Sequence, residues 1–358
     1  MRKAIFAITL GFLAFGCASL ESPYASSTKI YIQQDNLEKA LENANKWIAE
    51  DSTNAKAYLW RAIIYTRKYK YAEAANDFKR AFTLDSTYMD KGKFEKTVAI
   101  AGQPLMPYEA VSAVFNNAAV KLINDGKYDE ALPYLEYSLK VNPNNANTYL
   151  LLHTVYNAKG DEKKAKEYLI EAVKRDPNNY HAKLQLAVLY SYEGNKQEAE
   201  KLLKEVIQAV ESDTAADDKV KLEVYKEYAI LMFEQKKYDE AIKYFKKAYE
   251  IKKDDYEVLA NLGNVYAAKK DYENAVKYLK QAYALKKDDY RIPQALAEVL
   301  YEQKRYKEAL KYINDAIKLK GDDPALYRIR AAIYKAMGKR RAALRDLKKA
   351  MQLEKKGK

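Results

Sequence analysis

The chain has 358 residues, and its 63 Lys and Arg against 50 Asp and Glu give a formal net charge of +13. Hydrophobic residues make up 48% of the chain, which excludes an intrinsically disordered protein because there is enough apolar material for a buried core. The chain has one cysteine and two histidines. This excludes an intramolecular disulfide and a cysteine-based metal cluster, and leaves little for imidazole chemistry.

The first residues are typical of an export signal. Arg2 and Lys3 precede the apolar run 4–15, which is followed by Gly16 and Cys17. A helix of that length rises about 18 Å and falls short of the ~30 Å hydrocarbon core of a bilayer. The sequence therefore predicts a signal peptide over residues 1–16 and not a membrane span.

The residues before and after Cys17 resemble a bacterial lipobox, in which the cysteine becomes the acylated first residue. That resemblance implies lipidation at Cys17, and Ala18 and Ser19 resemble an outer-membrane sorting signal. Ordinary cleavage after Ala18, using the small pair Gly16 and Ala18, is the alternative. We expect an exported protein anchored in the bacterial envelope, in the outer membrane and facing the periplasm.

A period of 34 residues runs through most of the remaining chain. The segment 252–256 recurs at 286–290, and alanines recur at 241, 275 and 309. The pattern resembles the tetratricopeptide repeat, and the copy at 256–289 carries Leu262, Gly263, Tyr266, Ala275, Leu279 and Ala282 at its signature positions. The resemblance implies an all-α, right-handed superhelical solenoid of helix–turn–helix units.

Nine frames fit this repeat: 21–54, 55–88, 112–145, 146–179, 180–213, 222–255, 256–289, 290–323 and 324–357. They group into N-terminal frames at 21–88, middle frames at 112–213 and C-terminal frames with a basic cap at 222–358. Residues 89–111 form an insertion, which we expect to contain a loop at 102–107 and to act as a hinge. Residues 214–221 are expected to form an extended turn. Pro293 and Arg330 replace signature residues, so irregular first turns are expected in the last two frames.

The sequence contains no recognisable catalytic motif: no Gly-rich phosphate loop, no Gly-x-Ser-x-Gly elbow and no His-Glu-x-x-His pair. The acidic pairs 254–255, 288–289 and 322–323 recur at the turn between units, which favours helix N-caps over metal ligands. His153 is expected to be packed and hydrogen-bonded. We therefore predict a protein that is not an enzyme and has no cofactor and no metal.

Tyrosine is unusually frequent, and 21 of the 33 tyrosines fall at four repeat positions. Periodic placement favours packing between helices over a platform for nucleic-acid bases.

The resemblance also implies a concave surface lined by the first helix of each unit. The side chains expected to face this groove are Asn116, Asn117, Asn147, Asn157, Tyr192, Asn261, Asn264, Gln294, Tyr301 and Arg328. Amides donate and accept hydrogen bonds, so they can pair with a peptide backbone of any sequence. We expect a scaffold or adaptor that binds peptides or helices of other envelope proteins, besides the membrane contact through Cys17.

The positive charge is concentrated at the C-terminal end. Residues 222–358 hold 33 basic against 21 acidic side chains, a net +12. The basic tip comprises Arg330, Lys335, Lys339, Arg340, Arg341 and Arg345. Such a cluster is interpreted first as a solvated cap, with docking on anionic lipid, cell-wall polymer or nucleic acid as the alternative function. Nucleic acid is the least favoured of the three because the chain is expected to be exported.

Overall fold

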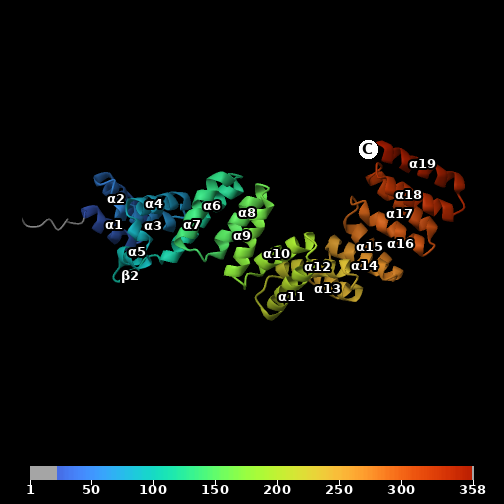
Figure 1. The fold of residues 1–358 in the computed structure, drawn as a ribbon, viewed down its shortest axis with the longest axis horizontal. Helices are drawn as coiled ribbons and strands as arrows, with labels where there is room; N and C mark the ends of the chain where they lie inside the picture. The colour runs from blue at the N-terminus through green and yellow to red at the C-terminus, as the bar shows by residue number, and fades with distance from the viewer. Residues whose placement is uncertain (1–21, 357–358) are drawn as a thin grey trace, which may run out of the picture. The chain divides into compact units, whose positions relative to one another are not determined.

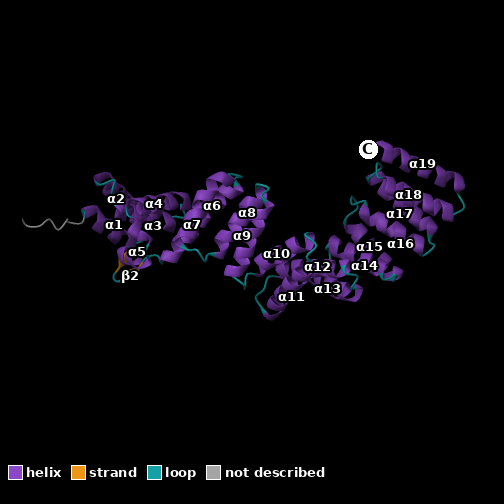
Figure 2. Cartoon of the chain, viewed as in Figure 1, coloured by secondary structure: helices purple, strands orange, loops and turns teal. Residues whose placement is uncertain are grey.

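A computed structural model describes residues 22–356, so the predicted signal peptide at 1–16 and the lipidation at Cys17 lie outside the described residues. The chain divides into two compact units, one ending at Arg175 and the other beginning at Asp176. Helices dominate both units, as Figure 2 shows.

Unit 1 contains α1 (Pro23–Gln33), α2 (Leu37–Glu50), α3 (Ala55–Arg67), α4 (Tyr71–Leu84), the 3₁₀ helix η1 (Ser86–Met89), α5 (Lys91–Thr97), β1 (Ala99–Ile100), β2 (Gln103–Pro104), α6 (Tyr108–Asn124), α7 (Tyr128–Val141), α8 (Ala146–Ala158) and α9 (Glu162–Arg175). Unit 2 contains α10 (Tyr180–Tyr192), α11 (Lys196–Ser212), α12 (Asp218–Glu234), α13 (Tyr238–Ile251), α14 (Tyr256–Ala268), α15 (Tyr272–Leu285), α16 (Arg291–Glu302), α17 (Tyr306–Leu319), α18 (Pro324–Ala336) and α19 (Arg340–Lys356).

Consecutive helices pack as pairs, and each pair packs on the next within its unit (Figure 1). The helices are amphipathic, so each buries one stripe. In α17 the buried residues Ala309, Ile313 and Ala316 follow the helical spacing of a single face. The predicted fold class, an all-α solenoid of helix–turn–helix units, is confirmed.

Each turn between paired helices has a residue in the left-handed region at the same place in the repeat. These residues are Asp35, Tyr69, Gly126, Gly160, Gly194, Lys236, Lys270, Lys304 and Gly338, with φ between 56° and 80°. This backbone position reverses the chain after the first helix, and glycine adopts it at least cost. Its recurrence in every frame agrees with the predicted register of nine repeats.

Small residues allow the paired helices to approach closely. In the pair α14–α15, a Cβ added at Gly263 would lie 2.5 Å from Cγ of Leu279, so α14 contacts α15 directly at this glycine. In α8 the equivalent residue is His153, whose Nδ1 donates to the carbonyl of Ala165 at 2.9 Å. The prediction of a packed, hydrogen-bonded histidine is confirmed.

The tyrosines join the two helices of a repeat. Tyr156 stacks on Tyr168 with ring centroids 5.3 Å apart, and the corresponding rings of Tyr266 and Tyr278 are 5.6 Å apart. Other tyrosine hydroxyls are used within the same scaffold: those of Tyr149 and Tyr327 each donate at 3.0 Å to a carbonyl six residues earlier. The prediction that these tyrosines pack between helices is confirmed.

The insertion at 89–111 is structured and packed. It contains α5 and the antiparallel hairpin β1–β2, whose turn residues Ala101 and Gly102 both have positive φ, as a type I′ turn requires. Phe94 of α5 is fully buried, 6.1 Å from Phe78 and 5.4 Å from Tyr108 between ring centroids. The predicted loop at 102–107 therefore includes strand β2, and α5 belongs to the core of unit 1.

The other irregularities are smaller than expected. The second insertion contributes only residues 213–217 to a non-helical turn, because α12 already begins at Asp218. Helix α16 starts at Arg291, one residue late in its frame, and has no side-chain cap. Helix α18 begins regularly, with Asp323 accepting from the amide of Ala325, so the irregular first turn predicted for the frame 324–357 is wrong.

Candidate functional site

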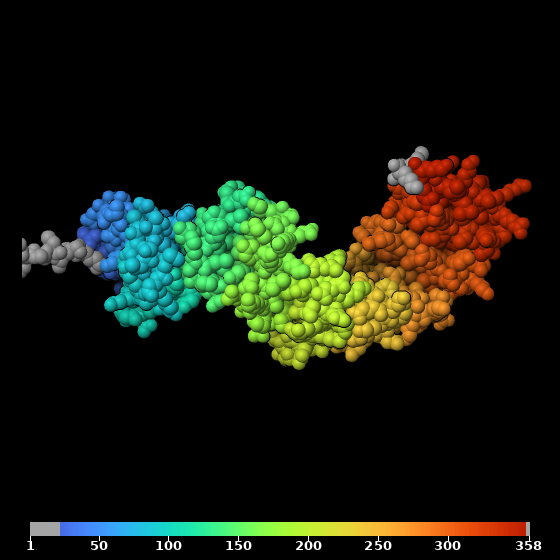
Figure 3. Space-filling view, viewed as in Figure 1, coloured from blue at the N-terminus to red at the C-terminus, as the bar shows by residue number. Residues whose placement is uncertain are grey.

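A cavity of about 540 Å³ in unit 2 is lined mainly by α12, α14 and α16, the first helices of three successive pairs, with Tyr192 of α10 and Leu279 of α15. In the space-filling view, unit 2 curves from its yellow-green start to its red end and leaves a hollow between them (Figure 3). The cavity is lined by Tyr192, Lys226, Glu227, Ile230, Tyr256, Glu257, Ala260, Asn261, Asn264, Leu279, Asp289, Arg291, Ile292 and Ala295.

Helical spacing explains why α14 contributes two amides to this surface. Asn261 and Asn264 are three residues apart and therefore lie on the same face of the helix. Neither side chain makes a hydrogen bond to another part of the chain that the structure describes. Both amides are thus available to a ligand in the cavity. These two belong to the groove residues expected from the sequence.

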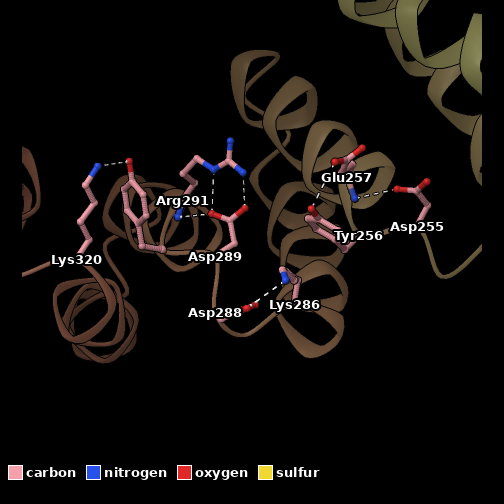
Figure 4. A network of polar contacts seen from close by, with 9 residues as sticks. Asp255, Tyr256, Glu257, Lys286, Asp288, Asp289, Arg291 and Lys320 are labelled. Atoms are coloured by element: carbon pink, nitrogen blue, oxygen red, sulfur yellow. Dashed lines mark hydrogen bonds and ion pairs between the residues drawn. The ribbon is translucent and has the colours of Figure 1, made fainter. Parts of the chain in front are cut away.

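Polar contacts at the turns between repeats of unit 2 lie beside the cavity (Figure 4). Asp255 accepts hydrogen bonds from the amides of Glu257 and Val258, at 3.0 and 3.2 Å, and so caps α14. Asp289 accepts from the amide of Arg291 at 3.0 Å and from its Nε and Nη2 at 2.9 and 2.6 Å. The hydrogen bond from the guanidinium lowers the pKa of Asp289. The predicted N-cap role is confirmed for Asp255, whereas Asp289 lies one residue before Tyr290, the N-cap of α16, and does not cap that helix.

Similar polar contacts involve the lysines of the neighbouring turns. Lys286 donates to Asp288 at 3.1 Å, and Lys320 donates to the hydroxyl of Tyr290 at 3.1 Å (Figure 4). The ammonium of Lys320 also lies 4.5 Å from the centre of the Tyr290 ring. The contact of Lys320 with Tyr290 joins the turns at the two ends of the repeat 290–323, and that of Lys286 with Asp288 lies within one turn.

Two neighbouring charges of α12 behave differently inside the cavity. Nζ of Lys226 lies 2.6 Å from Oε2 of Glu257 and 3.7 Å from Oδ2 of Asp255. Burial lowers the pKa of Lys226, but these carboxylates raise it and prevail, so the pKa is raised overall. Glu227, in contrast, has no hydrogen bond or ion pair within the described residues.

The environment of Glu227 penalises its negative charge. Burial raises the pKa of its carboxyl, and the charges of Glu223 and Glu257 raise it further, while Lys226 opposes them. The cavity lining carries three acidic and two basic side chains, a net −1, although residues 222–358 carry +12. The cavity is therefore a locally acidic spot in a basic region.

The other predicted groove residues are not brought together at this cavity, except for Tyr192 at its edge, which is 87% exposed. Asn117, Asn147, Asn157 and Arg328 are exposed elsewhere. Gln294 donates to Glu298 at 3.0 Å, and Tyr301 lines a different cavity of about 400 Å³. Arg328 pairs with Glu354 at 2.5 Å.

Asn116 is a correction to the predicted groove. Its side chain is only 6% exposed and accepts from Oγ1 of Thr148 at 3.1 Å. It ends a buried chain of polar contacts across α6, α7 and α8. Ser138 lies at the centre of that chain, 2.8 Å from both Oγ of Ser112 and Oγ1 of Thr148. Asn116 thus belongs to helix packing in unit 1.

Arg330 likewise is not an exposed member of the basic tip, because its guanidinium is bound by Asp346 and Asn314. The remaining tip residues, Lys335, Lys339, Arg340, Arg341 and Arg345, are exposed and make no side-chain ion pair within residues 22–356. Helix α19 also exposes Leu344, Leu347 and Met351. These apolar residues share one face with several of the cations.

Among the described residues, no group of three or more His, Cys, Asp or Glu side chains is arranged to hold a metal ion. Within the same part of the chain, no helix has both the length and the apolar character needed to span a bilayer.

Models of the tetratricopeptide repeat match residues 122–172 and 266–333, 179–254, and 229–290, which together cover more than half of the chain. No curated protein shows significant similarity to it.

Several solved structures resemble parts of the chain. PilF of Pseudomonas aeruginosa is 16% identical, with a TM-score of 0.49 over 59% of this chain and 92% of its own. YrrB, described as having an unusual peptide-binding site, is 18% identical, with a TM-score of 0.44 over 53% and 93%. MamA of Desulfovibrio magneticus is 17% identical, with a TM-score of 0.45 over 49% and 96%.

Proposed function

Because the chain belongs to the tetratricopeptide repeat family, we propose that it is a non-catalytic scaffold that binds partner peptides or helices in the groove of unit 2. The observation that carries this proposal is the pair of amides on α14. Asn261 and Asn264 line a cavity of about 540 Å³ and have no hydrogen-bond partner within the described residues.

The groove suits a polypeptide better than a compact small molecule. Its amides offer both donors and acceptors, which match the N–H and C=O groups of a backbone. Ala260 and Ala295 have small side chains, so the backbone of a bound peptide can come close to α14 and α16 at these two residues. Ile230, which is half-buried, supplies apolar surface for the peptide's side chains.

Co-purification of partners with the full-length protein tests this proposal. Changing both Asn261 and Asn264 to Ala is expected to remove the partners. A matched variant with Asn147 and Asn157 both changed to Ala loses two exposed amides of unit 1 and is expected to keep them. Unchanged partners in the Asn261/Asn264 variant would contradict binding at this groove.

The proposed location is the bacterial envelope, with a lipid anchor at Cys17 and the repeats facing the periplasm. The leader pattern supports this part of the proposal. Metabolic labelling with a fatty-acid analogue is expected to mark the wild type and not the Cys17→Ser variant. Equal labelling of both would reject the anchor.

A second candidate function is docking of α19 on an anionic lipid surface. Its exposed Leu344, Leu347 and Met351 are accompanied by the exposed cations Arg341, Arg345, Lys348, Lys349 and Lys355. An apolar stripe flanked by cations is typical of helices that lie on anionic membranes. The exposed apolar residues favour anionic lipid over cell-wall polymer and nucleic acid as the surface that α19 binds.

Vesicle sedimentation tests the second candidate. The protein is expected to sediment with phosphatidylglycerol vesicles at low salt and to be released from them at high salt. It is not expected to bind phosphatidylcholine vesicles. The variant with Arg341 and Arg345 both changed to Glu should bind less. Equal sedimentation with both lipids, or no effect of the variant, would reject this function.

A further inference from the structure

We propose that the groove of unit 2 selects an extended peptide that carries one Lys or Arg side chain, and that this cation is held by Glu227. The inference rests on the proposed function, since it identifies the kind of peptide that the groove binds. In this proposal the amides of Asn261 and Asn264 bind the peptide backbone, and Glu227 selects peptides that carry a basic side chain.

Among the residues that the structure describes, Glu227 is the carboxylate of the cavity lining that has no hydrogen bond or ion pair. Lys226, its neighbour on α12, is already bound by Glu257 at 2.6 Å. Asp289 is likewise bound by Arg291. Glu227 has neither a hydrogen bond nor an ion pair within residues 22–356, although it lies in the cavity wall. A half-buried carboxylate in this position gains most from a cation that enters with the ligand.

The raised pKa of Glu227 agrees with a carboxylate that lacks a bound cation. Burial and the acidic neighbours Glu223 and Glu257 raise it. A bound ammonium or guanidinium would oppose these effects and favour the ionised carboxylate.

The surrounding charge limits how basic the peptide can be. The cavity lining carries a net −1, whereas residues 222–358 as a whole carry +12. A polybasic peptide would be repelled by the lysines and arginines around the groove. A peptide with one cation flanked by neutral residues can pair with Glu227 without that repulsion.

The amides and apolar residues complete the recognition. Asn261 and Asn264 pair with the peptide backbone, while the half-buried Ile230 contacts an uncharged side chain beside the cation. The expected ligand is therefore an extended segment with a single Lys or Arg among small or apolar residues.

Peptide libraries test the inference. Four pools of N-acetylated, C-amidated nonapeptides carry Lys, Arg, norleucine or Glu at the centre and neutral residues elsewhere. Blocked ends ensure that the only cation is the central side chain. The full-length wild type is expected to retain the Lys and Arg pools about tenfold more than the norleucine pool, the size of one charge-assisted hydrogen bond.

Two isosteric variants distinguish binding of the cation by Glu227 from a general effect of removing one negative charge. Glu227→Gln is expected to bring the ratio of Lys to norleucine binding close to one. Glu250→Gln removes the same charge from a side chain of α13 that is 70% exposed and lies outside the cavity lining, and should keep the wild-type ratio. Circular dichroism on both variants checks that they are folded.

The outcomes distinguish the inference from the function on which it rests. If all pools bind equally and the Asn261/Asn264 variant loses them all, the groove binds peptides but the inference is wrong. A Lys preference that survives Glu227→Gln also overturns it. If no pool binds and the Asn261/Asn264 variant keeps its partners, the proposed groove function fails as well.

Discussion

Arg330 donates two hydrogen bonds to the carboxylate of Asp346, at 2.7 Å from Nε and 2.8 Å from Nη2. Its Nη1 reaches Asn314 of the preceding repeat at 2.8 Å. Arg61 makes the same set of contacts with Asp77, at 2.7 and 2.8 Å, and with Asn45 at 3.0 Å. The two arginines occupy the same repeat position, so one packing device is used twice, once in each unit.

Removing one member of this pair should destabilise its repeat. Arg330→Ala leaves Asp346 buried without its partner, and a loss of about 3 kcal/mol in the free energy of unfolding is expected. Arg61→Ala should have a similar effect in unit 1 because Asp77 is buried to the same degree. Urea unfolding followed by circular dichroism measures both.

The control is a variant that removes both charges. Changing Arg330 and Asp346 together to Leu should recover much of the lost stability, because no buried charge is left unpaired. A fully stable Arg330→Ala variant would show that the contact is only a surface ion pair.

The buried polar chain of unit 1 should depend on Ser138. Its hydroxyl lies within 3.1 Å of the Ser112 carbonyl and 2.8 Å from the hydroxyls of Ser112 and Thr148. Ser138→Ala is expected to cost about 2 kcal/mol in unfolding free energy, since several buried groups lose a partner. Ser27→Ala is the matched control, because that hydroxyl is only locally bonded to the Pro23 carbonyl. Equal stability of the two variants would contradict the prediction.

Three lysines occupy the left-handed turn position where glycine is preferred. Lys270, with φ of 67°, is exposed, so Lys270→Gly should remove backbone strain and stabilise unit 2 by about 0.5–1 kcal/mol. Lys277→Gly lies within α15 and should destabilise it by about 1 kcal/mol. Thermal unfolding of both variants should therefore show shifts of opposite sign. A lower melting temperature for Lys270→Gly would disprove this account of the turn.

Acid should weaken the contact between α11 and the turn before α13. Burial favours a raised pKa for Glu200, but hydrogen bonds from Lys204, Gln235 and Lys237 prevail and lower it to about 2. A carboxyl with a lowered folded-state pKa stabilises the fold above its unfolded-state pKa, near 4.5, and loses this contribution as pH falls toward 2.

The expected acid-dependent loss is on the order of 1 kcal/mol, because the lysines are partly exposed and their charge is screened. Urea unfolding between pH 6 and 3 should thus show a shallower pH dependence for Glu200→Gln than for the wild type. Glu250→Gln serves as the control and should follow the wild type. Identical pH profiles for Glu200→Gln and the wild type would refute the assignment.

Repetition explains what the sequence could predict. Alanines such as Ala241, Ala275 and Ala309 recur where helices cross, and all three are fully buried, so the period predicts both the helix pairs and their packing. The period does not identify the left-handed turn position, because only some frames have glycine there. The even spacing of Gly126, Gly160 and Gly194 is a signal that could have revealed it.

The individual site residues were harder to predict because they depend on contacts that the period does not specify. The repeat position of Asn116 predicts that its side chain faces the groove. Instead, this side chain is buried because it accepts a hydrogen bond from Thr148, which lies in the following repeat. Arg330 reads as a tip cation unless its partner Asp346, 16 residues away, is known. Nothing in the sequence distinguishes Glu227 for the same reason, since what sets it apart is the absence of a partner within the described chain.

The shared left-handed turn also bears on how such an array changes length over time. Lys236, Lys270 and Lys304 are identical residues at one repeat position, and segment 252–256 is copied at 286–290, as expected of duplicated units. Deleting residues 271–304 would join Lys270 to Arg305 and rebuild the junction that Lys304 now makes. Removing or inserting 34 residues at these turns therefore requires no new backbone conformation at the junction.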